Sequence, residues 1–278
     1  MTKKFKYPAV LTIAGSDSSG GAGIQADLKT FSALGCYGMS VITALTAQNT
    51  CGVRGIHSVP AAFVKDQLQA VLEDVYPGAI KIGMVHNIEL IETIAATLIQ
   101  YPDIPVVFDP VMIATSGDRL IEENTVKSII ERLFPLATLI TPNLDEGALL
   151  ADTQIETVEQ MLIAGKKIMT LGCNALLLKG GHLKSPELTS ILFDNRGLTK
   201  HYVSQKIDTK NTHGSGCTLS SAIACYLALG MALPDAITAA QDYVHEAIDA
   251  GRNVITGKGN GPLNHFYNPH KLILNEMV

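Results

Sequence analysis

Short apolar runs alternate with longer stretches of mixed character along most of the chain. Residues 106–108 form one of the short runs, whereas Ile91, Ile94 and Leu98 recur at the spacing of a longer stretch. Short runs are typical of buried strands, and a spacing of three to four residues is typical of helices that bury one face. We predict strands over residues 9–14, 38–45, 79–82, 106–108, 137–140 and 175–178, and helices over residues 24–34, 61–72, 88–100, 120–133, 144–151, 158–171, 215–230 and 234–254.

A glycine turn separates two further apolar runs. Residues 190–193 and 200–203 flank Asn195-Arg196-Gly197, a pattern typical of a β-hairpin. Elsewhere strands and helices alternate, with no long linker, low-complexity segment or short repeat between them. This order predicts one α/β domain over residues 1–278, with a mostly parallel sheet covered by helices on both faces and a flexible N-terminus at residues 1–8.

Most of the predicted strands end at a distinctive polar, glycine or methionine residue. In an open parallel sheet the carboxyl ends of the strands line one crevice, which is where such proteins bind ligands. We therefore expect these strand-end residues to share one site. They are Gly15, Gln48, Met84, Asp109, Asn143 and Lys179.

Residues 211–218, with the sequence NTHGSGCT, join a polar stretch to an apolar helix without charges. Gly214 and Gly216 flank Ser215 at the mouth of that helix, where backbone N–H groups lack helical acceptors and the helix dipole is positive. Such an arrangement suits an anion, above all a phosphoryl group. The same spacing also forms simple tight turns, so this segment alone leaves both interpretations open.

Cys217 lies beside this candidate anion nest. A cysteine in a helix is usually a small core hydrophobe. At a helix N-terminus, however, the thiolate is favoured, and the residue then becomes a base or a nucleophile.

Composition narrows the class of protein. The chain has 278 residues, of which 47% are hydrophobic, and a net charge of −5, which argues against general binding to nucleic acid or anionic membranes. Its five cysteines show no paired spacing, so the pattern indicates no disulfide framework or zinc site and favours a reducing cytoplasm. Residues 1–8 lack the apolar stretch of a signal peptide, and the uncharged window 214–234 is better explained by a buried helix than by a membrane span.

Three acidic or amide residues admit both a structural and a functional interpretation. Asn143 and Glu146 have the spacing of a reciprocal helix cap, and they could equally bind Mg²⁺ and its nucleotide, directly or through water. Asp109 before Pro110 could be a turn residue or a contact to metal or phosphate.

Three further residues are candidates because of their place in the predicted elements. Lys179 ends a buried strand, where an ammonium group needs a partner, and we expect that partner to be a phosphate. Gln48 either satisfies loop amides or reads the edge of a heterocycle with its donor and acceptor. Asp27, inside the first helix, is most simply a solvated residue, but we keep it as a candidate for substrate binding.

Carboxylates, lysine and anion nest together fit phosphoryl transfer. That reaction needs cationic contacts to phosphates, a metal with oxygen ligands and a nest for the transferred charge. The loop 15–23 matches neither GxGxxG nor GxxxxGK[ST], and the chain contains no HExxH or GxSxG motif.

Several motifs, which are spread over nearly the whole chain, resemble those of one family of kinases. The family is that of the hydroxymethylpyrimidine and phosphomethylpyrimidine kinases of thiamine biosynthesis. The motifs are LTIAGSDSSGGAGIQADLK at 11–29, VITALTAQNT at 41–50, KIGM at 81–84, TPNL at 141–144, LKGGH at 178–182, NTHGSGCT at 211–218 and GNGPLNHF at 259–266. Together they are far more specific than any one of them.

The resemblance implies a ribokinase-like fold and transfer of the ATP γ-phosphoryl group to the hydroxymethyl oxygen of the pyrimidine. It also implies a second transfer onto the monophosphate, with ATP and Mg²⁺ as cofactors, and a homodimer. By resemblance, Gln48 hydrogen-bonds the pyrimidine, and Met84 and Val111 make apolar contacts to its ring. Gly15 and Asp27 are further candidates for substrate binding. Gly214, Ser215, Gly216 and Cys217 form the catalytic anion hole, and Cys217 stands where related sugar kinases carry an Asp. Lys179, Asn143 and Thr212 contact nucleotide, whereas Asp109 and Glu146 contact metal.

Two alternatives to this function stay open. A closely similar pyridoxal kinase carries a lid cysteine two residues after its match to Asp109-Pro110-Val111-Met112, whereas this chain has Ala114 there and no cysteine in the lid. This difference favours the pyrimidine substrate without excluding activity on pyridoxine-type alcohols. A non-catalytic vitamin sensor would need no anion hole, so Cys217 and Lys179 argue against it. Ser215 replaces the threonine of many relatives but keeps the hydroxyl, and we expect little effect.

Overall fold

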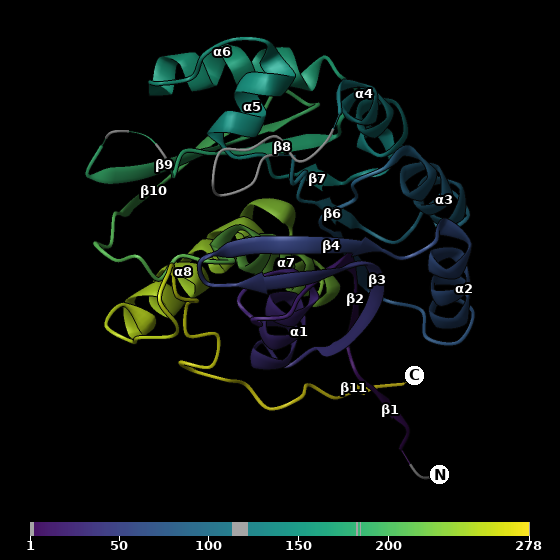
Figure 1. The fold of residues 1–278 in the computed structure, drawn as a ribbon. Helices are drawn as coiled ribbons and strands as arrows, with labels where there is room; N and C mark the ends of the chain where they lie inside the picture. Colours follow the sequence, from purple (N-terminus) through teal and green to yellow (C-terminus); the bar gives the residue numbers. More distant parts are fainter. Residues whose placement is uncertain (1–2, 113–121, 182, 184, 278) are drawn as a thin grey trace.

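A nine-stranded sheet forms the centre of the protein (Figure 1). The computed structural model describes residues 3–112, 122–181, 183 and 185–277. The strands of this sheet are Ala9–Asp17 (β2), Tyr37–Asn49 (β3), Gly52–Ser58 (β4), Ala79–Ile82 (β5), Val106–Phe108 (β6), Leu139–Ile140 (β7), Ala175–Lys179 (β8), Glu187–Asp194 (β9) and Thr199–Gln205 (β10). Their order is β10-β9-β8-β7-β6-β5-β2-β3-β4, with β8 to β3 parallel and the outer strands β4, β9 and β10 antiparallel to their neighbours.

Helices cover both faces of this sheet, as the alternation of elements predicts (Figure 1). They are Gly23–Ala33 (α1), Ala61–Leu72 (α2), Ile88–Leu98 (α3), Glu123–Arg132 (α4), Leu144–Ala151 (α5), Val158–Met169 (α6), Ser215–Ala228 (α7) and Leu233–Gly251 (α8). One apolar layer joins the sheet to α2 through α6, and a second layer joins it to α1, α7 and α8.

The strand order reverses beside β2. After β2 the chain moves outward to β3 and β4, then returns to the other side of β2 and continues through β5, β6, β7 and β8. The connections after β2 and β5 therefore leave on opposite sides, and such a reversal opens a crevice at the carboxyl ends of the strands. Gly15 lies near the end of β2 and Met84 follows β5, so both stand at this crevice.

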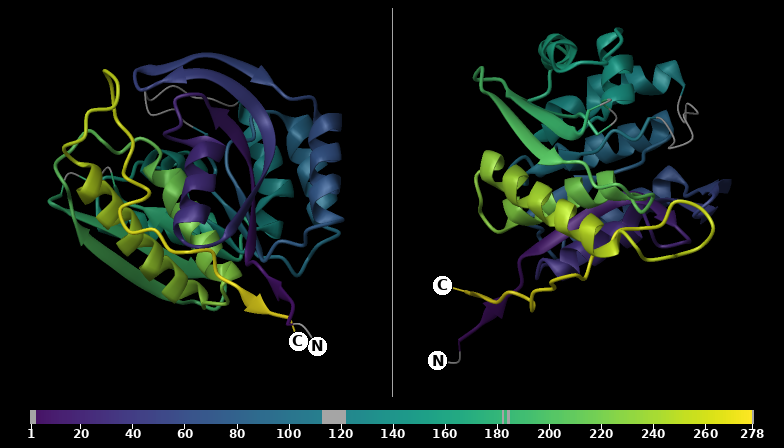
Figure 2. Two further views of the ribbon diagram at one scale, coloured as in Figure 1. Left: turned by 90° about the horizontal axis from the view of Figure 1, so that it is seen from below. Right: turned by 90° about the vertical axis from the view of Figure 1, so that its left-hand side faces the viewer.

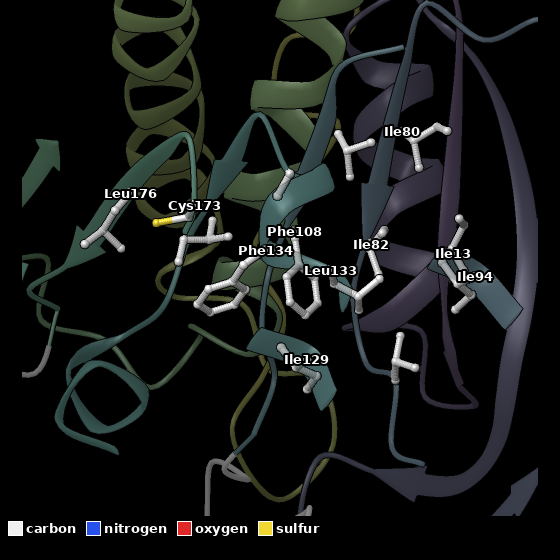
Figure 3. Packing of buried hydrophobic residues seen from close by; sticks show 14 of the residues in the cluster. Ile13, Ile80, Ile82, Ile94, Phe108, Ile129, Leu133, Phe134, Cys173 and Leu176 are labelled. Carbon is white, nitrogen blue, oxygen red and sulfur yellow. The ribbon is translucent and has the colours of Figure 1, made fainter. Parts of the chain in front are cut away.

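Alternate residues of each strand feed the two apolar layers. Ile80 and Ile82 of β5 pack on the side of α2 through α6, whereas Ala79 packs on the side of α1, α7 and α8. In the larger layer Phe108 and Phe134 meet edge to face, with ring centroids 6.3 Å apart (Figure 3). Burial of this apolar surface on both sides fixes the register of the central strands.

Helix α7 is the apolar helix without charges that the sequence predicts. Its residues from Thr218 to Cys225 are buried, and it packs against α1, α8 and the sheet. None of the helices in the described part of the chain has the length and hydropathy that a membrane crossing requires.

The two ends of the chain lie side by side (Figure 2). Phe5–Lys6 (β1) pair antiparallel with Asn275–Glu276 (β11), and Lys3 forms an ion pair with Glu276 at 2.9 Å. The N-terminal segment that the sequence predicts to be flexible thus contains a short strand at Phe5 and Lys6. Their partner strand lies at the far end of the chain, where no local pattern reveals it.

The predicted elements agree with the structure except at a few places. The sequence misses β4, because all seven of its residues are exposed at the sheet edge and show no buried face. The strand predicted over 137–140 begins only at Leu139, because Phe134–Leu136 form a 3₁₀ turn before it. Helix α4 is described from Glu123, whereas its predicted start at residue 120 lies outside the described residues, together with the rest of residues 113–121.

Candidate active site

A cavity of about 540 Å³ opens at the carboxyl ends of β2, β3, β5, β6 and β8, and the N-terminus of α7 forms part of its wall. This is where the reversal in strand order places a ligand site. The cavity brings together every site residue predicted from the sequence except Asp27. These residues are Gly15, Gln48, Met84, Asp109, Val111, Asn143, Glu146, Lys179, Thr212, Gly214, Ser215, Gly216 and Cys217.

The glycine at the start of α7 has a backbone that only glycine can adopt there. Gly214 has φ +81°, and a Cβ on it would lie 1.9 Å from the carbonyl oxygen of Gly21. This close approach packs the start of α7 against the loop of residues 15–23, the first glycine loop. Gly216 and Cys217 then belong to the first turn, whose N–H groups have no acceptor within the helix and carry the positive end of its dipole.

Two charged side chains stand at the mouth of this nest. A Cβ on Gly216 would lie 3.3 Å from Lys179 Nζ and 3.6 Å from Asp109 Oδ2, so the ammonium and the carboxylate both approach the first turn of α7. Lys179 Nζ donates to Asp109 Oδ1 at 2.8 Å, and Thr141 Oγ1 donates to the same oxygen at 2.9 Å. The partner of Lys179 within the protein is thus Asp109, and a phosphate at the nest would lie beside both.

Cys217 is partly exposed to the cavity. Burial raises the pKa of the Cys217 thiol above its usual value of 9.0, against the opposing effect of the Lys81 ammonium. Asp27 and Asp109 raise it further. Burial therefore opposes the thiolate that the helix N-terminus is expected to favour.

Asp27 is not the solvated helix residue that the sequence suggests. Its carboxylate is fully buried and forms an ion pair with the fully buried Lys81 at 2.9 Å. Thr12 Oγ1 and Ser221 Oγ also donate to it, at 2.6 and 2.7 Å. The carboxylate therefore ties α1, β2, β5 and α7 together behind the cavity wall, and Lys81, which does line the cavity, stands between Asp27 and the site.

Asn143 and Glu146 form the reciprocal cap of α5 that their spacing predicts. Asn143 Oδ1 accepts from the N–H of Glu146 at 3.0 Å, and Glu146 Oε2 accepts from the N–H of Asn143 at 2.9 Å. Glu146 Oε1 also accepts from the N–H of Met112 at 3.2 Å. Burial raises the pKa of Glu146 to about 7, because it outweighs the nearby Lys179 ammonium, and Asp109 adds to the effect.

These carboxylates fit a magnesium ion that is shared with phosphates. The described residues contain no cluster of three or more His, Cys, Asp or Glu side chains. Mg²⁺ in nucleotide sites is commonly held by one or two carboxylates, waters and the phosphates themselves. Asp109, with Oδ2 near the nest, would provide one ligand, and Glu146 would act through water because both its oxygens already accept backbone N–H groups.

The residues that line the cavity come from both sides of the strand order, and α7, which begins at the nest, packs on β2, β5 and β6 in the middle of that order; we call the two sides the ends of the cavity. One end is walled by Gly15, Met84 and Val111 with the strand residues Val53 and Ile56, and Gln48 provides its polar group. A Cβ on Gly15 would lie 2.9 Å from Met84 Cε, so a side chain at this position would displace the end of the methionine. The other end is walled by residues of β9, β10 and α8, namely Leu188, Tyr202, Val244, His245 and Ile248.

The sequence did not reveal several of these residues. Asp17 and His213 line the cavity and contact each other at 2.9 Å, although they lie 196 residues apart in the chain. Lys81 sits within an apolar strand, where a lone buried lysine is itself a signal that a partner exists. The residues of α8 show only the helical pattern, which does not distinguish a cavity wall from core. His182 of the LKGGH motif, like the lid segment 113–118, lies outside the described residues.

Fold and site together define a class of protein. A doubly wound α/β domain holds a two-ended cavity, and a cationic helix mouth, two lysines and two acidic groups stand between its ends. This is the arrangement of an enzyme that transfers an anionic group between two small molecules.

Comparison with known proteins places the chain within this class. The model of the family described as phosphomethylpyrimidine kinase matches residues 17–264. A hydroxymethylpyrimidine/phosphomethylpyrimidine kinase of Rhizobium meliloti is 51% identical, over 92% of this chain and 96% of the relative. A thiamine biosynthesis bifunctional protein of Geobacter sulfurreducens is also 51% identical, but the chain spans only 53% of its length. The chain belongs to the phosphomethylpyrimidine kinase family.

Solved structures agree with this assignment and with the ribokinase-like fold. The crystal structure of a phosphomethylpyrimidine kinase from Clostridium difficile is similar with a TM-score of 0.77 and 47% identity, over 86% of this chain and 99% of that one. An ADP complex of Bacillus subtilis pyridoxal kinase gives a TM-score of 0.86 with 35% identity, over 94% and 98% of the two chains. The backbone alone therefore does not separate the two kinds of kinase, whereas sequence identity favours the pyrimidine kinases.

Proposed function

We propose that the protein transfers the γ-phosphoryl group of ATP to the hydroxymethyl oxygen of hydroxymethylpyrimidine, and then transfers a second one to the resulting monophosphate. The observation that carries this proposal is the position of the α7 nest between the two ends of one cavity. An acceptor at the Gln48 end and a nucleotide at the α8 end would meet at the nest. Membership of the family supports the same reaction.

The residues around the nest have separate roles in this proposal. The N–H groups of Gly216 and Cys217 hold the transferred phosphoryl group, and the Lys179 ammonium offsets its charge. Cys217 lies beside the nest, where it either accepts the proton of the acceptor hydroxyl or positions that hydroxyl. A loose phosphoryl-transfer transition state needs little more than positioning and charge stabilisation.

Nucleotide and metal fit the acidic side of the site. Lys179, Asn143 and Thr212 line the cavity where the phosphates of ATP would extend from the α8 end toward the nest. A Mg²⁺ ion held by Asp109, and by Glu146 through water, would neutralise charge on those phosphates. Holding the nucleotide in line with the acceptor hydroxyl is the contribution of the protein.

The acceptor end suits a small aromatic ring with a polar edge. Met84, Val111 and Gly15 offer an apolar slot for the ring, and Gln48 offers one donor group and one acceptor for its edge. A pyridoxine-type alcohol has a similar size and remains the second candidate, supported by the likeness to pyridoxal kinase structures. The higher identity to pyrimidine kinases and the missing lid cysteine favour the pyrimidine.

Assembly and location complete the proposal. We expect a homodimer because of the resemblance. We expect the protein to reside in the cytoplasm because its cysteines are free. Light scattering at micromolar protein concentration would measure twice the chain mass of 29.6 kDa. A mass of a single chain under those conditions would contradict the dimer.

A substrate panel tests the proposed reaction. Purified protein with ATP and Mg²⁺ is given hydroxymethylpyrimidine, its monophosphate or pyridoxal at equal concentrations, and ADP release is followed by a coupled assay. Release with both pyrimidines at rates well above that with pyridoxal is the expected result. Brisk release with pyridoxal alone would assign the protein to the second candidate. Tight binding of the pyrimidine without any ADP release would indicate a sensor.

A further inference from the structure

Asp17 organises the first glycine loop around its carboxylate. Oδ1 accepts from the N–H and the hydroxyl of Ser19, at 2.8 and 2.7 Å. Oδ2 accepts from the N–H groups of Gly21 and Ala22, at 3.1 and 2.9 Å. These donors, together with His213, hold the pKa of Asp17 well below its usual range although burial opposes them. Asp17 is thus an ionised group that can only accept hydrogen bonds.

His213 must place a hydrogen on its Nε2 atom because of this neighbour. Nε2 lies 2.9 Å from Asp17 Oδ2, and a carboxylate oxygen can be paired only with a donor. The ring is held in place by packing, since a Cβ on Gly21 would lie 2.3 Å from His213 Cδ2. His213 therefore presents a donor, already committed to Asp17, toward the acceptor end of the cavity.

Gln48 lies between two groups whose hydrogens are both committed. Its side-chain nitrogen is 3.5 Å from His213 Nε2, which pairs one donor with another. Its side-chain oxygen is 3.2 Å from Thr46 Oγ1, but that hydroxyl has a better acceptor in the carbonyl of Ser16 at 2.8 Å. Rotating the amide by half a turn resolves both conflicts, because its nitrogen then donates to Thr46 Oγ1 and its oxygen faces the His213 donor.

The backbone of Gln48 is fixed by the same loop. Ser18 Oγ accepts from the Gln48 N–H at 2.9 Å and donates to the Gln48 carbonyl at 2.8 Å. With the backbone clamped and both side-chain neighbours committed, only one orientation of the amide avoids facing a donor with a donor. That orientation leaves the second amide hydrogen of Gln48 for a ligand.

We propose that Asp17 and His213, with Thr46, are positioning residues that hold the Gln48 amide in this one orientation and so set which heterocycle edge the site accepts. The inference rests on the proposed function and deepens it. A ring nitrogen that meets the remaining Gln48 hydrogen is accepted, whereas a C–H at the same place leaves a donor unpaired. The network thus favours a pyrimidine over a pyridine whose ring nitrogen lies elsewhere.

The first test replaces the imidazole while keeping its packing. His213→Phe keeps a ring over Gly21 but removes the Nε2 donor. KM for hydroxymethylpyrimidine should rise about fivefold to tenfold, as expected for one misoriented hydrogen bond, while KM for ATP and kcat stay within about twofold. The exposed His201→Phe, on β10, is the matched control and should change none of these values. An unchanged pyrimidine KM in a folded His213→Phe protein would overturn the proposal.

A double-mutant cycle then asks whether His213 acts through Gln48. Gln48→Ala should raise the pyrimidine KM about tenfold, and His213→Phe/Gln48→Ala should raise it no further. Effects that multiply would show that His213 acts independently and would overturn the proposal. Thr46→Val, which removes the second neighbour, should show the same dependence on Gln48 and decides the matter if His213→Phe fails to fold.

A pair of substrate analogues completes the test. Each replaces one ring nitrogen of hydroxymethylpyrimidine by C–H. The wild-type protein should discriminate against one of them about tenfold in kcat/KM, and His213→Phe should lose most of that discrimination. Equal discrimination in both proteins would overturn the proposal. Failure of the proposed function appears separately, as absence of turnover with the unmodified pyrimidine by the wild-type protein.

Discussion

At the scale of single residues, Cys217 connects the sequence pattern to the proposed chemistry. From the sequence alone, Cys217 could be either a packed core residue or a catalytic group. It lines the cavity at the first turn of α7 and is not one of the fully buried cysteines, in contrast to Cys225 further along the same helix. Because burial raises the pKa of its thiol, Cys217 starts as a neutral group. It can therefore position the acceptor hydroxyl at rest, and it can accept the proton of that hydroxyl only after the thiol has lost its own proton.

Replacing this thiol separates binding from turnover. Cys217→Ala should lower kcat about 10²–10⁴-fold, the range of general-base catalysis, while pyrimidine affinity stays within about twofold. Steady-state kinetics and calorimetric titration of the pyrimidine measure the two effects. The exposed Cys51→Ala is the control and should behave as the wild type. Unchanged turnover in Cys217→Ala would mean that the thiol only packs.

At the scale of elements, the site depends on how α7 is held. Asp27 and Lys81 attach it to α1, β2 and β5 through Ser221, and the buried His265 contacts Thr218 one turn after the nest, with 3.1 Å between Nε2 and Oγ1. Gly214 seats its first residue against Gly21. Each of these contacts can be weakened separately.

Breaking the buried ion pair should destabilise the protein strongly. Lys81→Met leaves the Asp27 carboxylate buried without its cation, which typically costs about 3–5 kcal/mol. The double variant Lys81→Met/Asp27→Asn should recover most of this loss, since Thr12 and Ser221 contact different Asp27 oxygens, so that the amide oxygen can accept from one hydroxyl and the amide N–H can donate to the other. Urea unfolding provides the free energies. Lys127→Met, in the exposed pair with Glu131, is the control and should cost less than about 0.5 kcal/mol. A comparable loss of unfolding free energy in Lys81→Met and Lys127→Met would contradict this account.

The start of α7 should tolerate no side chain. Gly214→Ala adds a Cβ that meets Gly21 O and imposes strain at φ +81°, so it should cost at least about 2 kcal/mol and reduce kcat by displacing the nest. Gly172→Ala is a matched control, because φ there is +95° with no heavy atom within 4 Å of the added Cβ. That change should cost about 1 kcal/mol and leave kcat unaltered. Normal turnover in Gly214→Ala would refute the nest.

The His265 contact predicts a dependence of stability on pH. Burial lowers the pKa of His265 from 6.5 to about 4, with a smaller effect of Lys29. Because the unfolded chain binds this proton more readily, stability is lost as pH falls from about 6.5 toward 4. Between pH 7.5 and pH 5 the wild type should lose about 2 kcal/mol more than His265→Gln, as measured by urea unfolding. An equal loss in the two proteins would show that His265 is not buried in its neutral form.

At the scale of the whole molecule, the alternation of strand and helix patterns was enough to predict the layered sheet and the crevice. Gln48, Asp109 and Lys179 could be placed at one site because they end parallel strands. The edge strand Gly52–Ser58 and the pairing of Phe5 with Glu276 could not be predicted, since the first has no buried face and the second joins the chain ends. Side-chain pairs such as Asp17 with His213 depend on tertiary approach, which no spacing reveals.

The central claim is that one cavity serves two successive phosphoryl transfers. The most direct test incubates the protein with hydroxymethylpyrimidine, Mg²⁺ and excess ATP and follows the products over time by ³¹P NMR. We predict a monophosphate that appears first and is then converted to a diphosphate, with two ADP formed per pyrimidine. Accumulation of the monophosphate as the final product, with one ADP per pyrimidine, would contradict the claim.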